Sequence, residues 1–258
     1  TLGRLPARWV GAGVSAQVAS LAPQGIANDV LLRWDGEPSA PAHYRVDARL
    51  AGLQLAAAPA EPARSPDGDV EPGRPGLQGA DVELHATEAG GRARIVLAGG
   101  ALELPGVFAE PRVPIERLDG ELSWKLEPGH DGAPPRVELL APGLSFANAD
   151  AAGRVDLRWT SAPQPGGSGV LELDGRLERA DAARVARYLP LQMNAEAREY
   201  VGGAVLAGRI RAAEVRLRGD LDRFPFDGAQ AAAGEFRFAA QVEGVRYDPA
   251  PGPDGDGG

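Results

Sequence analysis

Most of this chain alternates between apolar and charged residues at every second position. That period, in which successive side chains point to opposite faces, is typical of β-strands with one buried face. Residues 153–159 show it most clearly, because Val155, Leu157 and Trp159 alternate with charged residues. The same pattern predicts strands at residues 29–34, 44–50, 81–86, 92–97, 101–104, 118–126, 136–140, 144–146, 169–177, 214–218, 234–242 and 245–247.

This pattern predicts a mainly β fold of roughly a dozen strands of about 5–8 residues. One apolar and one charged face per strand favour a curved antiparallel meander that is wet on one side, because parallel strands buried on both faces would read as continuous apolar runs. The predicted helices are too few to cover such a sheet. The apolar face is therefore covered by a second sheet in a sandwich, or it curves inward around something else.

A helical period replaces the alternation at three places. Residues 13–23 have apolar side chains at helical spacing and stop at Pro23. Asp181 is the expected N-cap of a short helix that runs through Tyr188. Asn194 is the expected N-cap of a second helix, with Gly208 just past its end.

The expected organisation is one β-groove segment over residues 1–247. The segment 57–76 holds five prolines, so we expect a flexible insertion there. Residues 181–208 are a helical insertion, and residues 248–258 form a tail that is disordered by composition.

Composition and charge narrow the function classes. A net charge of −9 without a basic run predicts no nucleic-acid partner and no attraction to anionic membranes. The absence of cysteine excludes disulfides, a thiolate nucleophile and cysteine-held metals, and it fits a periplasmic or surface protein. No apolar run approaches the ~20 residues that span a bilayer. Because the chain starts at Thr1 without Met, we expect it to be a piece of a longer protein.

Residues 11–16, Gly-Ala-Gly-Val-Ser-Ala, imitate a dinucleotide-binding fingerprint. No buried strand leads into them and no βαβ unit follows, so a turn is the better interpretation. The histidines His43, His85 and His130 are far apart in sequence. Without cysteine, a zinc site built on them would need carboxylate ligands, and we expect solvated histidines instead.

Two Asp-Gly-Asp sequences, at residues 67–69 and 254–256, look like fragments of calcium loops. Neither has the alternating ligands and terminal Glu of an EF-hand, so we expect solvated carboxylates. No Gly-x-Ser-x-Gly elbow is present either. The sequence therefore predicts no catalytic residue, no metal, no cofactor and no enzyme activity.

An ordered set of short motifs resembles the YhdP family of AsmA-like, TamB-related proteins of Gram-negative bacteria. The most recognisable part lies around the helical insertion: Tyr188-Leu-Pro190, Met193, a helix ending at residues 204–208, then Val215-x-Leu217-x-Gly219-Asp-Leu221-x-x-Phe224-Pro-Phe226. Similar pieces precede it in the family's order: residues 21–25 followed by a strand to Trp34, residues 75–79, residues 111–124, residues 144–148 and residues 171–175. The chain departs from the pattern at Tyr200-Val201, where Trp-Leu is expected, and after Tyr247, where the family continues to Trp-Pro.

The resemblance implies a periplasmic protein that is tethered to the inner membrane and carries phospholipid toward the outer membrane along an apolar groove. Its implied partners are phospholipid acyl chains and membrane proteins at either end of the full-length protein. Under this interpretation acyl chains cover the apolar face, and the helical insertion either caps the groove or covers an edge of the sheet. The expected groove-lining residues are Val82, Leu84, Ile95, Leu97, Leu122, Trp124, Val155, Leu157, Trp159, Leu171, Leu173, Val215, Leu217, Phe236 and Phe238.

Two other interpretations stay open. The lining residues are also what the core of an ordinary sandwich would contain. A structural or protein-binding β-domain that scaffolds envelope partners is the alternative function.

Overall fold

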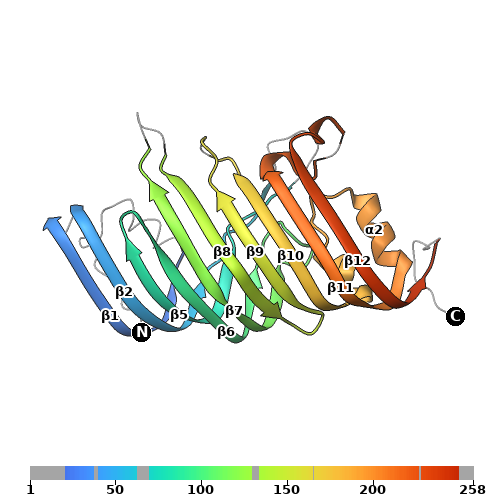
Figure 1. Cartoon of the computed structure of the whole chain (residues 1–258), viewed down its shortest axis with the longest axis horizontal. Coiled ribbons are helices and arrows are strands. Elements are labelled where there is room, and N and C mark those ends of the chain that lie inside the picture. The colour runs from blue at the N-terminus through green and yellow to red at the C-terminus, as the bar shows by residue number, and fades with distance from the viewer. Residues whose placement is uncertain are drawn as a thin grey trace.

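The computed structural model describes residues 21–37, 40–62, 70–129, 134–164, 166–226 and 228–249. Ten strands form one open antiparallel sheet in which each strand pairs with its neighbours in sequence order (Figure 1). These strands are β1 (Gln24–Glu37), β2 (Ala40–Leu55), β5 (Gly76–Thr87), β6 (Gly90–Glu103), β7 (Arg112–Glu127), β8 (Arg136–Ala147), β9 (Ala151–Thr160), β10 (Val170–Asp181), β11 (Val205–Asp220) and β12 (Gly234–Tyr247). The predicted mainly β, curved antiparallel fold is confirmed.

The two ends of the strands carry different connections. We call one the hairpin end, where the β1–β2, β5–β6, β7–β8, β9–β10 and β11–β12 connections lie. The other is the insertion end, where β10 leads into the helical segment before β11. Short and long connections occur at both ends, since residues 148–150 join β8 to β9 at the insertion end and residues 221–233 join β11 to β12 at the hairpin end.

The strands bend in the middle, so the sheet curls into a trough (Figure 1). Gly52, Gly99, Gly143 and Gly244 have φ of +61°, +78°, +60° and +61°, and the strand pairing slips by a residue close to each of Gly52, Gly143 and Gly244. Such β-bulges bend a strand and increase its twist, and glycine takes the left-handed conformation at least cost. A row of bulges across the sheet therefore produces its curvature.

Carboxylates on neighbouring strands brace two of these bulges. The Gly52 backbone N–H donates to Oδ1 of Asp81 at 2.9 Å. In the same way the Gly143 N–H donates to Oδ1 of Asp156 at 2.8 Å. Each bond satisfies a backbone donor that the bulge removes from the regular ladder.

Several predicted strands are too short, because the glycines at these bulges look like strand ends in the sequence. Residues 92–97 and 101–103 belong to one strand, β6, which continues through Gly99 and ends one residue before the predicted end at Leu104. Residues 136–140 and 144–146 likewise belong to β8, which is 12 residues long. The strand predicted at residues 118–126 begins earlier, since β7 starts at Arg112 and its Pro114 pairs with Ala101.

The two faces of the sheet differ as the alternation predicts. The strand pairing aligns one uncharged residue per strand along a row that crosses the whole sheet: Leu32, Val46, Ala86, Gly91, Trp124, Leu139, Trp159, Leu171, Gly219 and Gly234. We call this side the apolar face. The opposite side, the charged face, carries the intervening polar residues.

Ion pairs join neighbouring strands across the charged face. Asp174 accepts hydrogen bonds from Arg216 at 2.8 Å and from Arg218 at 2.9 Å, and both bonds hold the pKa of its carboxyl below the ordinary range, that from Arg218 most strongly. Arg94 contacts Asp119 at 3.0 Å in the same manner. Exposed pairs of this kind contribute little stability each, about 0–1 kcal/mol, but they favour the observed register.

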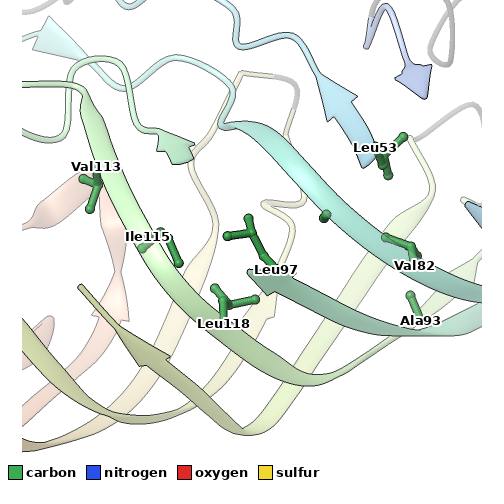
Figure 2. Packing of buried hydrophobic residues seen from close by; sticks show 8 residues of the cluster. Leu53, Val82, Ala93, Leu97, Val113, Ile115 and Leu118 are labelled. Carbon is green, nitrogen blue, oxygen red and sulfur yellow. The ribbon is translucent and has the colours of Figure 1, made fainter. Parts of the chain in front are cut away.

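The main hydrophobic core lies on the apolar face of β2, β5, β6 and β7. Its buried residues, shown in Figure 2, are Leu53, Ala80, Val82, Ala93, Leu97, Val113, Ile115 and Leu118. Leu104 and Phe108, from the β6–β7 connection, pack against this cluster, and so does Tyr188 from the helical segment. The core is therefore closed by connecting segments, since the only other sheet in the described residues is the short pair β3 (Glu61–Pro62) and β4 (Val70–Glu71).

Both predicted helices of the insertion are present. Asp181 caps the 3₁₀ helix η2 (Ala182–Tyr188) by accepting from the Ala183 N–H at 3.0 Å. Asn194 caps α2 (Ala195–Ala204) by accepting from the Ala197 N–H at 3.2 Å. The predicted end at Gly208 is wrong, because β11 begins directly after α2 at Val205 and Gly208 lies within that strand. The short 3₁₀ turns η3 (Leu221–Arg223) and η4 (Gly228–Gln230) connect β11 to β12.

Several predictions fall outside the described residues. They are the helix at residues 13–23 except its last positions, the fingerprint-like residues 11–16, His130, residues 67–69, and the tail from residue 250 onward. Within the proline-rich insertion, the described residues bond to each other and to the β6–β7 connection: the Ala58 N–H donates to the Arg74 carbonyl at 3.0 Å. The Gly73 N–H donates to the Pro105 carbonyl at 2.8 Å.

Candidate functional site

The predicted lining residues all lie on the apolar face. Leu173 is the direct cross-strand partner of both Leu157 and Leu217. Leu217 in turn pairs with Phe236 on the edge strand β12. A second line runs parallel to this one, in which Val215 pairs with Phe238. Side chains paired in this way lie about 4.5–5.5 Å apart at Cβ, so they form continuous apolar lines.

The tryptophans and the strands near β1 join the same surface. Trp124 and Trp159 are both partners of Leu139, and Trp159 also pairs with Leu171. On the same face, but nearer to β1, Val82 of β5 pairs with Ile95 of β6. The remaining lining residues continue these lines: Leu84 and Leu122 both pair with Ala93, Leu97 pairs with Leu118, and Val155 pairs with Leu144 and Gly175.

The lining residues differ in burial along the sheet. Leu97 is fully buried and Val82 is 7% exposed, so both belong to the core cluster. Those on β9, β10 and β11 are half-buried. Phe236 and Phe238 on β12 are 38% and 47% exposed. We call the eight buried core residues the covered part of the apolar face, and we call Val155, Leu157, Trp159, Leu171, Leu173, Val215, Leu217, Phe236 and Phe238 the open part.

Aromatic rings pack at the hairpin end of the open part. Phe226 is buried, and its ring occupies the space next to Gly219 and Gly234. A Cβ atom built on Gly219 would lie 2.7 Å from this ring, and one built on Gly234 would lie 2.6 Å from it. Phe224 contacts both Phe226 and Phe236 edge-to-face, at centroid distances of 5.6 and 5.5 Å. The Trp159 Nε1–H donates to the Ser168 carbonyl at 2.9 Å, so its polar atom is satisfied while the ring faces the groove.

Sequence reasoning missed some members of this surface. Leu139, Val46 and Leu32 share the row of Trp124 and Trp159, but only the strand pairing reveals it. Phe226 comes from a connection rather than a strand, so the alternation gave no signal for it. Leu139 stands beside Leu140, and two adjacent leucines do not show which one faces the apolar side.

The helical segment packs on the apolar face at the insertion end. Ala182 and Val185 of η2 pack with Ala180 and Ile210, and Tyr188 reaches the core of the neighbouring strands. Its ring meets Phe108 edge-to-face at a centroid distance of 5.9 Å. The helical segment therefore covers the apolar face rather than only an edge strand. It limits the open part at the insertion end.

A polar network holds the segment in place. The Tyr188 hydroxyl donates to Oδ2 of Asp150 at 2.7 Å and accepts from the side-chain amide of Asn148 at 3.0 Å. Arg187 bridges Asp150 at 3.1 Å and Glu110 at 2.8 Å. Burial of the phenol, and then its bond to the Asp150 carboxylate, raise the pKa of Tyr188.

Each histidine in the described residues makes a hydrogen bond with a carboxylate near the surface. His43 contacts Glu88 at 2.8 Å, and His85 contacts Asp47 at 2.6 Å. Glu88 also accepts from the Tyr44 backbone N–H, which with the His43 bond lowers the pKa of its carboxyl to about 2. Within the described ranges no three His, Cys, Asp or Glu side chains gather to hold a metal.

Comparisons with known proteins identify the chain. The model of one protein family, described as YhdP protein, matches residues 5–252. Searches of curated proteins and of solved structures find no match. None of the helices in the described residues is long and apolar enough to cross a membrane. The match suggests an AsmA-like protein of the cell envelope. Since it covers nearly the whole sequence, this chain belongs to the YhdP family.

Proposed function

We propose that this chain is a segment of a bridge protein that carries phospholipid along its apolar face, between the inner and outer membranes of a Gram-negative envelope. The observation that carries the proposal is the row of uncharged positions that crosses all ten strands without interruption. A core needs to be apolar only where something packs on it. Here the apolar character extends over strands whose side chains stay half-exposed.

Acyl chains supply the missing apolar contact. Burial of hydrocarbon is worth about 0.8 kcal/mol per methylene, so a 16-carbon chain gains roughly 10 kcal/mol in a groove that fully covers it. Partial exposure of the open part lowers this gain, which suits transport because a carried lipid must also leave. Val, Leu and Phe side chains offer contact without a fixed polar anchor.

The open trough keeps the headgroup in water. A charged headgroup buried in an apolar tunnel would cost several kcal/mol, whereas a groove with an open side avoids that cost. The proposed transport needs no catalytic residue and no cofactor, and we propose that the protein is not an enzyme. The net charge of −9 argues against nucleic acid as a partner.

We place the protein in the periplasm, tethered to the inner membrane in its full-length form. Membrane proteins at either end of the full-length protein are the proposed partners for loading and delivery. The acyl chains are proposed to follow the open part, where Leu157, Leu173 and Leu217 are consecutive cross-strand neighbours.

Lipid capture tests this proposal. Mass spectrometry of lipid extracted from the purified protein should detect phospholipid. A photo-crosslinker placed at Leu157 or Leu173 in cells should capture phospholipid. The matched control is Glu172, which neighbours Leu173 in β10 but lies on the charged face and is exposed. Absence of lipid from the extract and equal capture at Leu173 and Glu172 would remove the support for transport.

One observation favours the alternative, a protein-binding or scaffolding β-domain. The edge strand β12 exposes Phe236, Phe238, Val242 and Val245 by 38–50%, and an unpaired edge can accept a strand from a partner. Under this alternative, crosslinkers at Val242 capture protein while those at Leu173 capture no lipid. The two outcomes at Leu173 separate the two functions.

A further inference from the structure

We propose that a hollow on the charged face binds a phosphate group. The hollow has a volume of about 620 Å³ and lies at the hairpin end of β2, β5, β6, β7 and β8. Trp124 of the apolar face reaches its rim, but its charged lining residues lie on the opposite side of the sheet from the lipid-carrying surface proposed above, so we treat it as a separate site. Its lining residues that matter to the argument are Arg45, Arg92, Lys125, Ser123, Gly90 and Gly91.

The floor of the hollow is formed where β6 begins with two glycines. Thr87 of β5 pairs with Gly90, and Gly90 pairs with Lys125 of β7, so no side chain separates Thr87 from Lys125. Gly90 has φ of +140°, and a Cβ built on it would lie 2.2 Å from the Trp124 carbonyl oxygen. A larger residue is therefore excluded at this position, and the depression is part of the fold.

Three cations surround this floor, and their side chains have no partner among the described residues. The side chains of Arg45, Arg92 and Lys125 make no hydrogen bond or ion pair with any residue that the structure describes. Elsewhere on the same face most arginines pair with carboxylates across the strands, as Arg94 does with Asp119. The strand pairing explains the difference, because the direct partners of Arg92 are His85 and Ser123 rather than acids.

The acidic residues of the hollow are already engaged. Asp47 contacts Nδ1 of His85 at 2.6 Å, and Glu138 contacts Arg158 at 2.5 Å. Arg158 balances Glu138, so the three cations of the lining outnumber its one remaining carboxylate, Asp47, in a chain whose net charge is −9. An unbalanced cationic hollow in an acidic protein attracts anions locally.

The donor set favours phosphate among anions. Two guanidinium groups and one ammonium suit a compact oxyanion with more than one negative charge, since guanidinium binds phosphate oxygens through paired N–H donors. The Ser123 hydroxyl, the cross-strand neighbour of Arg92, makes no hydrogen bond within the described residues and adds a neutral donor. A phosphomonoester or pyrophosphate fits this set better than a single carboxylate, which offers fewer oxygens and less charge.

Titration calorimetry with pyrophosphate as the probe tests the site. Arg92→Gln and Lys125→Gln should each weaken binding by about tenfold, which corresponds to the loss of one charge-assisted hydrogen bond. Arg237→Gln is the matched control, because Arg237 is exposed on the charged face of β12, far from the hollow in strand order. It removes the same charge and should leave the affinity within about twofold.

A second titration distinguishes the source of the phosphate. Dihexanoyl phosphatidic acid, used below its micelle concentration, carries the same phosphomonoester on a lipid. Tighter binding of this lipid than of pyrophosphate assigns a lipid headgroup, and equal or weaker binding assigns free phosphate compounds. The proposal is overturned if neither probe binds, or if Arg237→Gln weakens binding as much as Arg92→Gln does. Circular dichroism of each variant confirms that it is folded.

Discussion

The covered and open parts of the apolar face come from the same sequence pattern, yet they differ in what lies over them. In the covered part Leu97 is fully buried, in a cluster against which Phe108, Leu104 and Tyr188 pack. In the open part Phe238 is 47% exposed, although it occupies an equivalent alternating position on its strand. The comparison shows that connecting segments, and not the strands, decide which stretch of an apolar face becomes a core and which stays available for a ligand.

The largest effect should separate the two parts by stability. Leu97→Ala removes a fully buried side chain and should lower the free energy of unfolding by about 3 kcal/mol. Leu173→Ala, in the open part, should cost about 1 kcal/mol because its side chain is half-buried and water can fill the space. Urea unfolding of both variants measures the difference. Equal losses would mean that the open part is as much a core as the covered part.

The next effect tests what keeps the helical segment on the face. Tyr188→Phe keeps the ring against Phe108 but removes the hydroxyl that bonds Asp150 and Asn148. The expected loss is about 1–2 kcal/mol, because both partners are left less satisfied in a partly buried place. Urea unfolding measures this loss.

Tyr247→Phe is the matched control for this variant, since it removes an exposed hydroxyl that bonds only Tyr200 among the described residues. Tyr247→Phe should lower the free energy of unfolding by less than half as much as Tyr188→Phe does. If the two variants lose the same stability, the network around Asp150 does not hold the segment.

A smaller effect tests the bend between the two parts. Gly143 lies in β8 with φ of +60°, and a Cβ built there meets no atom within 4 Å. Gly143→Ala should therefore cost about 1 kcal/mol from the left-handed backbone alone. Gly175→Ala is the control, because its Cβ would make only ordinary contact with Val215 at 3.6 Å. Chemical unfolding should show little change for the control, and a neutral Gly143→Ala would argue against the bulge as the source of curvature.

The smallest effect concerns the pH response of an exposed pair at the hairpin end. A hydrogen bond that the Glu88 carboxylate accepts from His43 raises the pKa of His43 above its ordinary 6.5, and the Glu88 carboxyl has its pKa lowered from 4.5 to about 2. The raised pKa of His43 contributes stability that is full below 6.5 and is lost as the pH rises through the folded-state pKa. The lowered pKa of Glu88 contributes stability that is present above 4.5 and is lost as the pH falls toward 2.

The pair is therefore most effective between about pH 4.5 and 6.5. A proton NMR titration should place the pKa of His43 above 6.5, and Glu88→Gln should return it toward that value. An unchanged pKa in the variant would assign the shift to another group.

The sequence predicted the faces better than the lengths of the strands. Alternation depends only on local geometry, so residues such as Leu157 and Leu173 could be assigned to one face without the structure. Local hydrogen bonding also made the caps at Asp181 and Asn194 predictable. The predicted strand boundaries were wrong at the glycine bulges, because a glycine such as Gly143 that bends a strand looks the same in sequence as one that ends it.

The covered part and the charged hollow could not be predicted in the same way. The cluster that contains Leu97 is packed against by Phe108 and Tyr188, which are distant in sequence and meet only in the folded chain. Arg92 has no side-chain partner among the described residues because of which residues the strand register places opposite it. Both features depend on contacts between residues that are distant in sequence, so no local sequence pattern predicts them.

Photo-crosslinking at two positions of the full-length protein in cells tests the central claim most directly. One crosslinker replaces Leu173 in the open part, and the other replaces Ile115, which is 4% exposed in the covered part. The account predicts phospholipid adducts at Leu173 and few or none at Ile115. Equal adducts at both positions, or none at Leu173, would contradict it.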